Sequence, residues 1–334
     1  MRRLYVTTSG PLGDLPLGTL VTTPPPLGVA DDDPAVLGKA AWLADRYAIT
    51  YLPAVSGLLL KGMRTPASGA AAEPFVGYGD PQLLGPVDGC KRGIQAFSGA
   101  VTRGLPTADS ELIKSLCPLP ETAGELRRMA ATLKGSDGMV HLRDQATESV
   151  LKSDPKLSGA RIVAFATHGT LAGEGTSAGL GFSEPGLIFT PPPSPISLAD
   201  GSMDDGVLTA SEASLLSLTA DWVILSACNT ASAQGSSGGD GLSALSRGFL
   251  YAGAHGLLAS HWRVADDSAS VLTVETIRIR QSHPELTRAQ ALQHAMKTVR
   301  TGLRDDGTAL SNYFPSFAHP ADWAPFTVIA NYDE

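Results

Sequence analysis

The sequence lacks the long apolar segments that mark membrane and secreted proteins. None of its 334 residues belongs to an uncharged apolar run near the roughly 18 residues that a membrane helix needs. The first seven residues (MRRLYVT) contain no apolar signal-peptide core. These absences predict a cytoplasmic protein that does not contact a membrane.

Basic residues are also in short supply. Lysine and arginine number 25 against 33 aspartates and glutamates, so the formal net charge is -8, and no basic cluster exceeds two residues. Because the phosphate backbone of nucleic acids requires a basic footprint, the charge balance disfavours nucleic acid as a partner.

Cysteine is scarce, and phosphate-binding motifs are missing. The three cysteines, Cys90, Cys117 and Cys228, are an odd number without C-x-x-C spacing, which argues against a disulfide framework and a structural zinc site. At least one thiol is therefore expected to be free. The sequence contains no P-loop and no G-x-G-x-x-G after a strand, so we expect neither a nucleotide nor another cofactor, and no metal.

From residue 74 onward, short apolar runs alternate with helical patterns. Hydrophobic residues make up 43% of the chain, enough for a sizeable core. The alternation predicts an α/β fold with a mostly parallel sheet. Strands are expected at 75–77, 139–142, 162–166, 187–189, 222–226, 256–260 and 326–329, and helices at 119–134, 146–153, 210–216, 242–251, 267–281 and 287–300.

The first 73 residues have a different pattern. A strand begins at residue 3, almost without preceding residues, which is typical of a domain cut from a longer chain. Helical spacing follows at 34–45 and 54–60, and the stretch 64–73, rich in Ala, Ser and Gly, is a candidate linker. Loop insertions are expected at 190–206 and 231–241.

Two predicted strands end in reactive side chains. The strand at 162–166 leads to His168 and Gly169, and the strand at 222–226 leads to Cys228. In an open parallel sheet both would reach the edge where α/β proteins bind ligands. A neighbouring imidazole can turn a thiol into a thiolate, and a glycine amide can point at a substrate carbonyl. The alternative is a buried structural cysteine, a hydrogen-bonded structural histidine and a turn glycine.

Other candidate motifs are weaker. The segment 235–239 (GSSGG) satisfies the G-x-S-x-G pattern of serine hydrolases, but no strand leads into it, so we interpret it as a loop. Cys90 precedes Lys91 and Arg92 in an expected exposed loop, and Cys117 marks the start of a helix. The remaining histidines show no metal-ligand spacing.

A series of motifs in order resembles the CHAT family, which comprises caspase-like and separase-like cysteine proteases. The resemblance covers nearly the whole chain. The matching stretches are 163–169 (VAFATHG), 205–212 (DGVLTASE), 223–231 (VILSACNTA), 239–242 (GDGL), 249–254 (FLYAGA), 259–266 (ASHWRVAD), His319–Pro320 with Trp323, and LYV at 4–6 with GPL at 10–12.

The resemblance implies a caspase-like three-layer sandwich with helices on both faces of the sheet. It also implies that His168 is a general base and Cys228 a nucleophile, with an oxyanion hole from the backbone N–H groups of Gly169 and Cys228. The departures leave this dyad intact: Asp240 stands where Glu is common, and His261 and Arg263 replace a frequent Leu and Pro.

The resemblance to separases extends to substrate preference. There, an acidic residue four positions after the tryptophan lies in a pocket for a basic side chain, and the matching residue is Asp266, four after Trp262. Asp267 and Asp240 are further candidates. The alternative is that Asp266 and Asp267 only favour the start of the following helix.

We therefore expect one CHAT domain over 1–334, with an accessory part at 1–70 and a catalytic part at 74–334. The expected function is a cysteine endopeptidase that cleaves a protein substrate after Arg or Lys. Its family often carries helical repeats upstream, so a regulatory protein or upstream repeat domain is an expected activator. The alternative is a catalytically silent module that binds a peptide without cutting it.

Overall fold

The structure of the chain is a computed structural model. It describes residues 2–8, 12–13, 15–23, 33–54, 73–86, 108–170, 183–199, 201–226, 244–262, 266–311 and 313–331, apart from the side chains of Ala35, Asp137 and Asp266.

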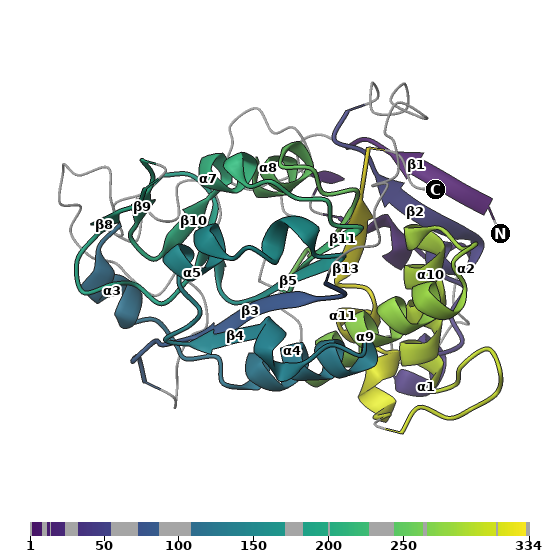
Figure 1. Cartoon of the computed structure of the whole chain (residues 1–334). Helices are drawn as coiled ribbons and strands as arrows, with labels where there is room; N and C mark the ends of the chain where they lie inside the picture. Colours follow the sequence, from purple (N-terminus) through teal and green to yellow (C-terminus); the bar gives the residue numbers. More distant parts are fainter. Residues whose placement is uncertain are drawn as a thin grey trace.

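An eight-stranded sheet forms the centre of the molecule, in the order β1-β2-β13-β12-β11-β5-β3-β4 (Figure 1). All neighbouring strands are parallel except β12 and β13, so β1, β2 and β13 run opposite to the other five. The carboxyl ends of β3, β4, β5, β11 and β12 therefore share one edge. The strands are β1 (Arg2–Val6), β2 (Tyr47–Tyr51), β3 (Val76–Pro81), β4 (Val140–Arg143), β5 (Ile162–Ala166), β11 (Trp222–Leu225), β12 (Leu257–Ser260) and β13 (Phe326–Ile329).

Helices cover both faces of this sheet (Figure 1). Alternate residues of β5 face opposite cores: Ile162, Ala164 and Ala166 pack with α4, α9, α10 and α11, whereas Val163 and Phe165 pack with α5, α7 and α8. This two-sided burial explains why the central strands are continuous apolar runs. The helices are α1 (Pro34–Leu37), α2 (Leu43–Arg46), α3 (Ser110–Lys114), α4 (Glu121–Thr132), α5 (Glu148–Ser153), α7 (Ala210–Leu215), α8 (Ala244–Tyr251), α9 (Asp266–Ser282), α10 (Arg288–Thr301) and α11 (Pro320–Trp323), with 3-10 turns η2 (Leu17–Thr19), η5 (Asp137–Met139), η6 (Leu157–Gly159) and η7 (Pro315–Ala318).

Two small antiparallel sheets lie beside the central one. The strands β6 (Gly169–Thr170), β7 (Gly186–Ile188) and β10 (Val207–Thr209) form the order β10-β7-β6. The pair β8 (Ile196–Ser197) and β9 (Met203–Asp204) lies within the stretch expected to be a loop insertion. The three-stranded sheet continues directly from the carboxyl end of β5 through His168.

The α/β class, the mostly parallel sheet and the helices on both faces are confirmed. The N-terminal segment differs in detail: the helical pattern at 34–45 becomes two four-residue helices, α1 and α2, and Tyr47–Tyr51 forms β2, a strand the sequence analysis missed. Both β1 and β2 join the central sheet, since β2 pairs with β13. The expected helix at 54–60, the linker at 64–73 and the loop at 231–241 lie outside the described residues, except Ala54 and Glu73.

Candidate functional site

His168 lies at the carboxyl edge of the sheet, two residues after β5. Its side chain is buried, with 5% of the residue exposed, and its Nε2 lies 2.8 Å from the carbonyl oxygen of Cys117. Because a carbonyl only accepts, this hydrogen bond assigns the proton of the neutral ring to Nε2. The other ring nitrogen, Nδ1, then carries the lone pair that a general base needs.

The main chain of His168 is held by the small sheet. Its carbonyl oxygen accepts a hydrogen bond from the N–H of Ile188 at 2.9 Å, and the hydroxyl of Thr167 donates to the carbonyl of Ile188. Gly169 pairs with Leu187 in the antiparallel register. The Ile188–His168 bond makes this a non-hydrogen-bonded pair, so the N–H of Gly169 points away from β7. That orientation suits an amide donor for a substrate oxygen.

The strand that leads to Cys228 is the direct neighbour of β5. Leu225 of β11 pairs with Phe165 in parallel, and the N–H of Ser226 donates to the carbonyl of Phe165 at 2.9 Å. The two strands therefore lie side by side and end at the same edge of the sheet, as the sequence predicted for that edge. Cys228, two residues after Ser226, lies outside the described residues, and so does Asp240.

The strand β12 borders β11 on its other side, with Val223 opposite Leu257. After β12 the chain reaches Asp266, the first residue of α9, whose side chain is outside the described part. Asp267 is exposed and lines a cavity of about 330 Å³ together with Arg128 and Phe314. Both aspartates occupy the first turn of α9, where the helix dipole favours acidic side chains.

A buried charged cluster, which was not predicted from the sequence, lies between α5 and the turn that precedes β10 of the small sheet. Glu148 is fully buried, and its Oε1 lies 2.9 Å from the Nζ of Lys152. Lys152 also contacts Oε1 of Glu212 at 2.8 Å. Burial raises the pKa of Glu148 to about 7, against the lowering effect of Lys152 and with further raising by Glu212 and Asp205. The sequence offered one signal, the motif 205–212 (DGVLTASE) with Asp205 and Glu212, whereas Glu148 looks like an ordinary helix-start acid.

Comparison with known proteins identifies the family. A family model described as the CHAT domain matches residues 1–331. The chain belongs to the CHAT domain family. This CHAT domain is also similar to separase in two crystal structures of the Saccharomyces cerevisiae separase–securin complex. The identities are 11% and 12% and the TM-scores 0.42 and 0.39. In both, the match covers 86% of this chain and 14% of the other, so the CHAT domain spans a small part of those proteins. No curated protein sequence matches it.

One cysteine of this CHAT domain departs from expectation. Cys117 is disulfide-bonded and 6% exposed, so the prediction that argued against disulfides was wrong for this residue. The two other cysteines, Cys90 and Cys228, both lie outside the described residues. Spacing could not reveal the bond, because disulfides depend on spatial proximity.

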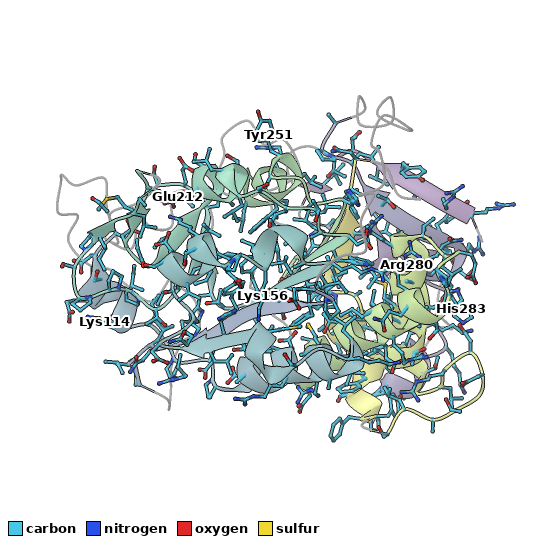
Figure 2. All side chains as sticks on the ribbon, in the orientation of Figure 1. Lys114, Lys156, Glu212, Tyr251, Arg280 and His283 are labelled. Atoms are coloured by element: carbon cyan, nitrogen blue, oxygen red, sulfur yellow. The ribbon has the colours of Figure 1, made fainter. Side chains whose placement is uncertain are left out.

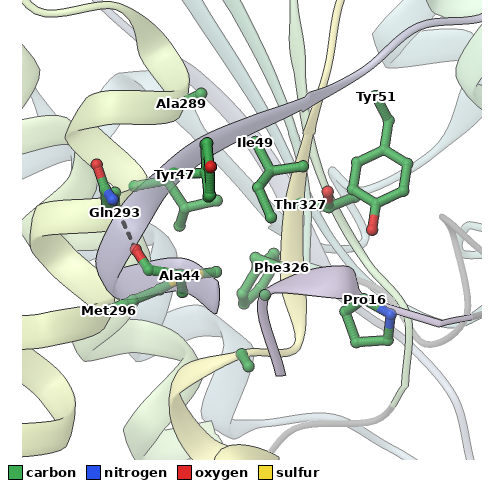
Figure 3. A pocket seen from close by; sticks show the side chains of 13 residues that line it. Pro16, Ala44, Tyr47, Ile49, Tyr51, Ala289, Gln293, Met296, Phe326 and Thr327 are labelled. Atoms are coloured by element: carbon green, nitrogen blue, oxygen red, sulfur yellow. Dashed lines mark hydrogen bonds between the residues drawn. The ribbon is translucent and has the colours of Figure 1, made fainter. Parts of the chain in front are cut away.

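A second cavity of the CHAT domain lies between β2, β13 and α10 (Figure 3). It measures about 30 Å³ and is lined by Tyr47, Ile49 and Thr327, among others. The side-chain amide of Gln293 closes one side by donating to the carbonyl of Ala44 at 2.6 Å. A space of this size holds about two water molecules and no peptide side chain.

Within the described ranges, no group of three or more His, Cys, Asp or Glu side chains has the arrangement of a metal site. Among the same residues, no helix combines the length and apolar character needed to cross a bilayer.

Proposed function

We propose that this CHAT domain is a cysteine endopeptidase in which His168 acts as the general base and Cys228 as the nucleophile. The observation that carries the proposal is the placement of His168. It lies at the carboxyl edge of β5 with Nε2 tied to the Cys117 carbonyl, and β5 is flanked in register by β11, the strand that precedes Cys228.

The chemistry follows from this tautomer. Nδ1 of His168 takes the thiol proton of Cys228, and the thiolate attacks the substrate carbonyl carbon. The Cys117 carbonyl accepts from Nε2–H throughout and favours the imidazolium that forms. The backbone N–H groups of Gly169 and Cys228 stabilise the oxyanion. The imidazolium then protonates the leaving amine, and water, deprotonated by His168, hydrolyses the acyl-thioester.

We further propose that cleavage follows an Arg or Lys, recognised by Asp266, with Asp267 and Asp240 as further candidates. A carboxylate in a partly desolvated pocket pairs with a basic side chain through a charge-assisted contact of about 1.5–3 kcal/mol. Asp266→Asn should lower kcat/KM toward basic substrates by roughly tenfold or more, and Asp267→Asn should lower it less. A peptide-library profile that keeps its basic preference in Asp266→Asn contradicts this assignment.

In this proposal the domain cleaves its protein substrate in the cytoplasm and binds neither a membrane nor nucleic acid. A partner protein or an upstream repeat domain orders the site before cleavage. The isolated domain should therefore be poorly active alone. High turnover of a generic peptide by the isolated domain would contradict the proposed need for an activating partner.

The decisive experiment compares wild type, Cys228→Ala and His168→Ala on candidate protein substrates, analysed by mass spectrometry. Because Cys117 is disulfide-bonded, each protein is assayed with and without a thiol reductant. Because the domain is expected to be poorly active alone, we expect slow but measurable cleavage by the wild type and essentially none by either variant, with circular dichroism unchanged. Cleavage by purified Cys228→Ala refutes the assignment. Peptide binding without cleavage by the wild type would favour the silent binding module instead.

A further inference from the structure

The carboxylate of Glu148 is wrapped by a turn from a distant part of the chain. Its Oε2 accepts hydrogen bonds from the backbone N–H groups of Asp205, Gly206 and Val207 at 2.9, 2.8 and 3.0 Å. Three convergent N–H groups form a site suited to an anion. Glu148, the first residue of α5, supplies that anion from inside the protein.

The shape of this turn depends on glycine. Gly206 has a φ of +90°, in the region that L-residues with side chains rarely adopt. A Cβ at this position would lie 2.6 Å from Cβ of Pro191. A residue with a side chain at position 206 would therefore be strained and would clash with Pro191, so the turn requires glycine there.

The charged groups that face Glu148 come from three elements. Lys152, on α5, is the cation, and its Nζ also contacts the carbonyl of Met203 at 2.8 Å. The carboxylates of Glu212 on α7 and of Asp205, just before β10, are the nearby negative charges that raise the pKa of Glu148. Asp204, 2% exposed, accepts from the N–H of Ser149 at 3.1 Å. Lys152 thus contacts two carboxylates, those of Glu148 and Glu212, and the buried negative charge at Glu148 is costly unless the turn's N–H groups solvate it.

One route from this carboxylate leads to the main chain of His168. Val207, whose N–H binds Glu148, begins β10 and pairs with Ile188 of β7. The N–H of Ile188 in turn donates to the His168 carbonyl at 2.9 Å. Only one strand therefore separates the turn around Glu148 from the backbone of His168.

A second route leads to the imidazole ring. Oδ2 of Asp205 accepts from the N–H of Ala108 at 2.8 Å, just before α3. The segment that follows α3 carries Cys117, whose carbonyl holds Nε2 of His168. The turn thus anchors both segments that place the histidine, one at its backbone and one at its ring.

We propose that Glu148 is a positioning residue for His168, holding the turn 205–207 so that the ring keeps its orientation and tautomer. This inference rests on the proposed general-base role of His168. Without the negative charge of Glu148, the N–H groups of the turn 205–207 lose a strong acceptor. The turn then holds less firmly both β7 and the segment that carries Cys117. The expected effect falls on kcat, because small displacements of a catalytic group slow chemistry more than they weaken binding.

The test uses Glu148→Gln, which keeps the side-chain length and removes the charge. The matched control is Asp221→Asn, which neutralises a carboxylate at the opposite, amino edge of the sheet. Hydrogen exchange followed by mass spectrometry should show faster exchange in 186–190 and 205–208 of Glu148→Gln than of the wild type above about pH 8, where the wild-type carboxyl, with its pKa raised to about 7, is ionised. The control should show wild-type exchange there. Equal exchange in these segments for both variants overturns the proposal, whether or not the wild type is active.

Activity supplies the second readout. We expect Glu148→Gln to lower kcat by about tenfold or more with KM changed by less than about threefold, and Asp221→Asn to leave both near wild type. The rate of the wild type should also fall in acid partly through protonation of Glu148, whose burial raises its pKa to about 7, and Glu148→Gln should lack that contribution. Faster exchange in 186–190 with an unchanged kcat, or an acid limb identical in both proteins, overturns the positioning role. Absence of wild-type turnover under all conditions argues against the proposed function, while the exchange data still decide whether Glu148 holds the His168 segment.

Discussion

Two carboxylates, Asp221 and Glu148, lie toward opposite edges of the central sheet and have different surroundings: cations around Asp221, and burial beside other carboxylates for Glu148. Asp221 precedes β11 at the amino edge, and its side chain is 38% exposed. It accepts from Nε of Arg161 at 2.9 Å, with Nδ1 of His255 at 3.4 Å and Nη2 of Arg288 at 3.8 Å. The hydrogen bond from His255, helped by both arginines and opposed by burial, holds the pKa of Asp221 well below its usual range.

Glu148, on the side of the carboxyl edge, is fully buried among other carboxylates with Lys152 as the cation. Figure 2 separates the two regions, with Glu212 of the Glu148 cluster and Arg280, which lines the small cavity beside Asp221, on opposite sides of the view. At the amino edge, basic side chains surround the Asp221 carboxylate, and these contacts stabilise the folded protein. On the carboxyl side, the buried Glu148 carboxylate lowers stability but holds a turn that one strand connects to the backbone of His168. Such a local sacrifice of stability is typical of functional sites.

The largest expected effect comes from breaking the buried cluster at its lysine. Lys152→Met keeps most of the apolar stem but leaves Glu148 and Glu212 without their cation. Removing one partner of a buried ion pair costs about 3–5 kcal/mol, so we expect a loss of unfolding free energy in that range. Urea unfolding followed by circular dichroism measures it. A loss smaller than that of Asp221→Asn would reverse the contrast between the two edges.

The next effect is the pH dependence of stability. Because the pKa of Glu148 is raised in the folded protein to about 7 from an ordinary 4.5, the folded state binds the proton more tightly. Its contribution is most favourable below pH 4.5 and is lost as pH rises to about 7, on the order of 3 kcal/mol at most. The unfolding free energy of wild type minus that of Glu148→Gln should therefore fall over this window. A difference that rises with pH contradicts the assignment.

Asp221 should show the opposite sign and a smaller effect. Its lowered pKa contributes stability at neutral pH that disappears as pH falls through and below the ordinary value of 3.8. Since the side chain is partly exposed, Asp221→Asn should cost about 1–2 kcal/mol at pH 7. Thermal unfolding at pH 7 and pH 3 checks this. The variant and wild type should converge at the lower pH, and a gap that widens there refutes the argument.

The smallest effect tests a carboxylate at the carboxyl edge whose partner is exposed. Oδ1 of Asp80 lies 3.3 Å from Nη1 of Arg143, whose side chain is 45% exposed. Exposed ion pairs contribute about 0–1 kcal/mol, so Arg143→Gln should change the unfolding free energy by less than about 1 kcal/mol. Chemical denaturation gives the value. A loss above about 2 kcal/mol would show that this edge depends on surface pairs as well as on buried ones.

The central strands were predictable because their burial on both faces leaves a direct mark on the sequence. β5 (IVAFA) and β11 (WVIL) are uninterrupted apolar runs, and both are buried at every residue. β2 was missed although its five residues (YAITY) suit a strand, because it follows directly on helical spacing. Its pairing with β1 and β13 is a long-range choice that local periodicity does not carry.

The candidate site was predictable where it depends on the order of strands and residues. The chain places His168 two residues after an apolar strand, and the α/β pattern predicts that parallel strands end at a common edge, whereas the direct pairing of β5 with β11 is a long-range contact that only the structure shows. The contact between Nε2 of His168 and the Cys117 carbonyl was not predictable, since a backbone oxygen carries no residue-specific signal. The disulfide state of Cys117 has the same cause, because it requires proximity rather than spacing.

The sequence by itself determined the α/β class, the apolar strands and the position of His168 at the end of one of them, because hydrophobic periodicity and chain order are local properties. Only the tertiary structure decided that Glu148 is buried inside a turn 57–59 residues away and that one carbonyl orients the imidazole. It also decided that Asp221 and Glu148 titrate in opposite directions. The physical reason is that the protonation and orientation of a polar group depend on burial and on the charges and dipoles around it, which distant segments supply only when the chain has folded.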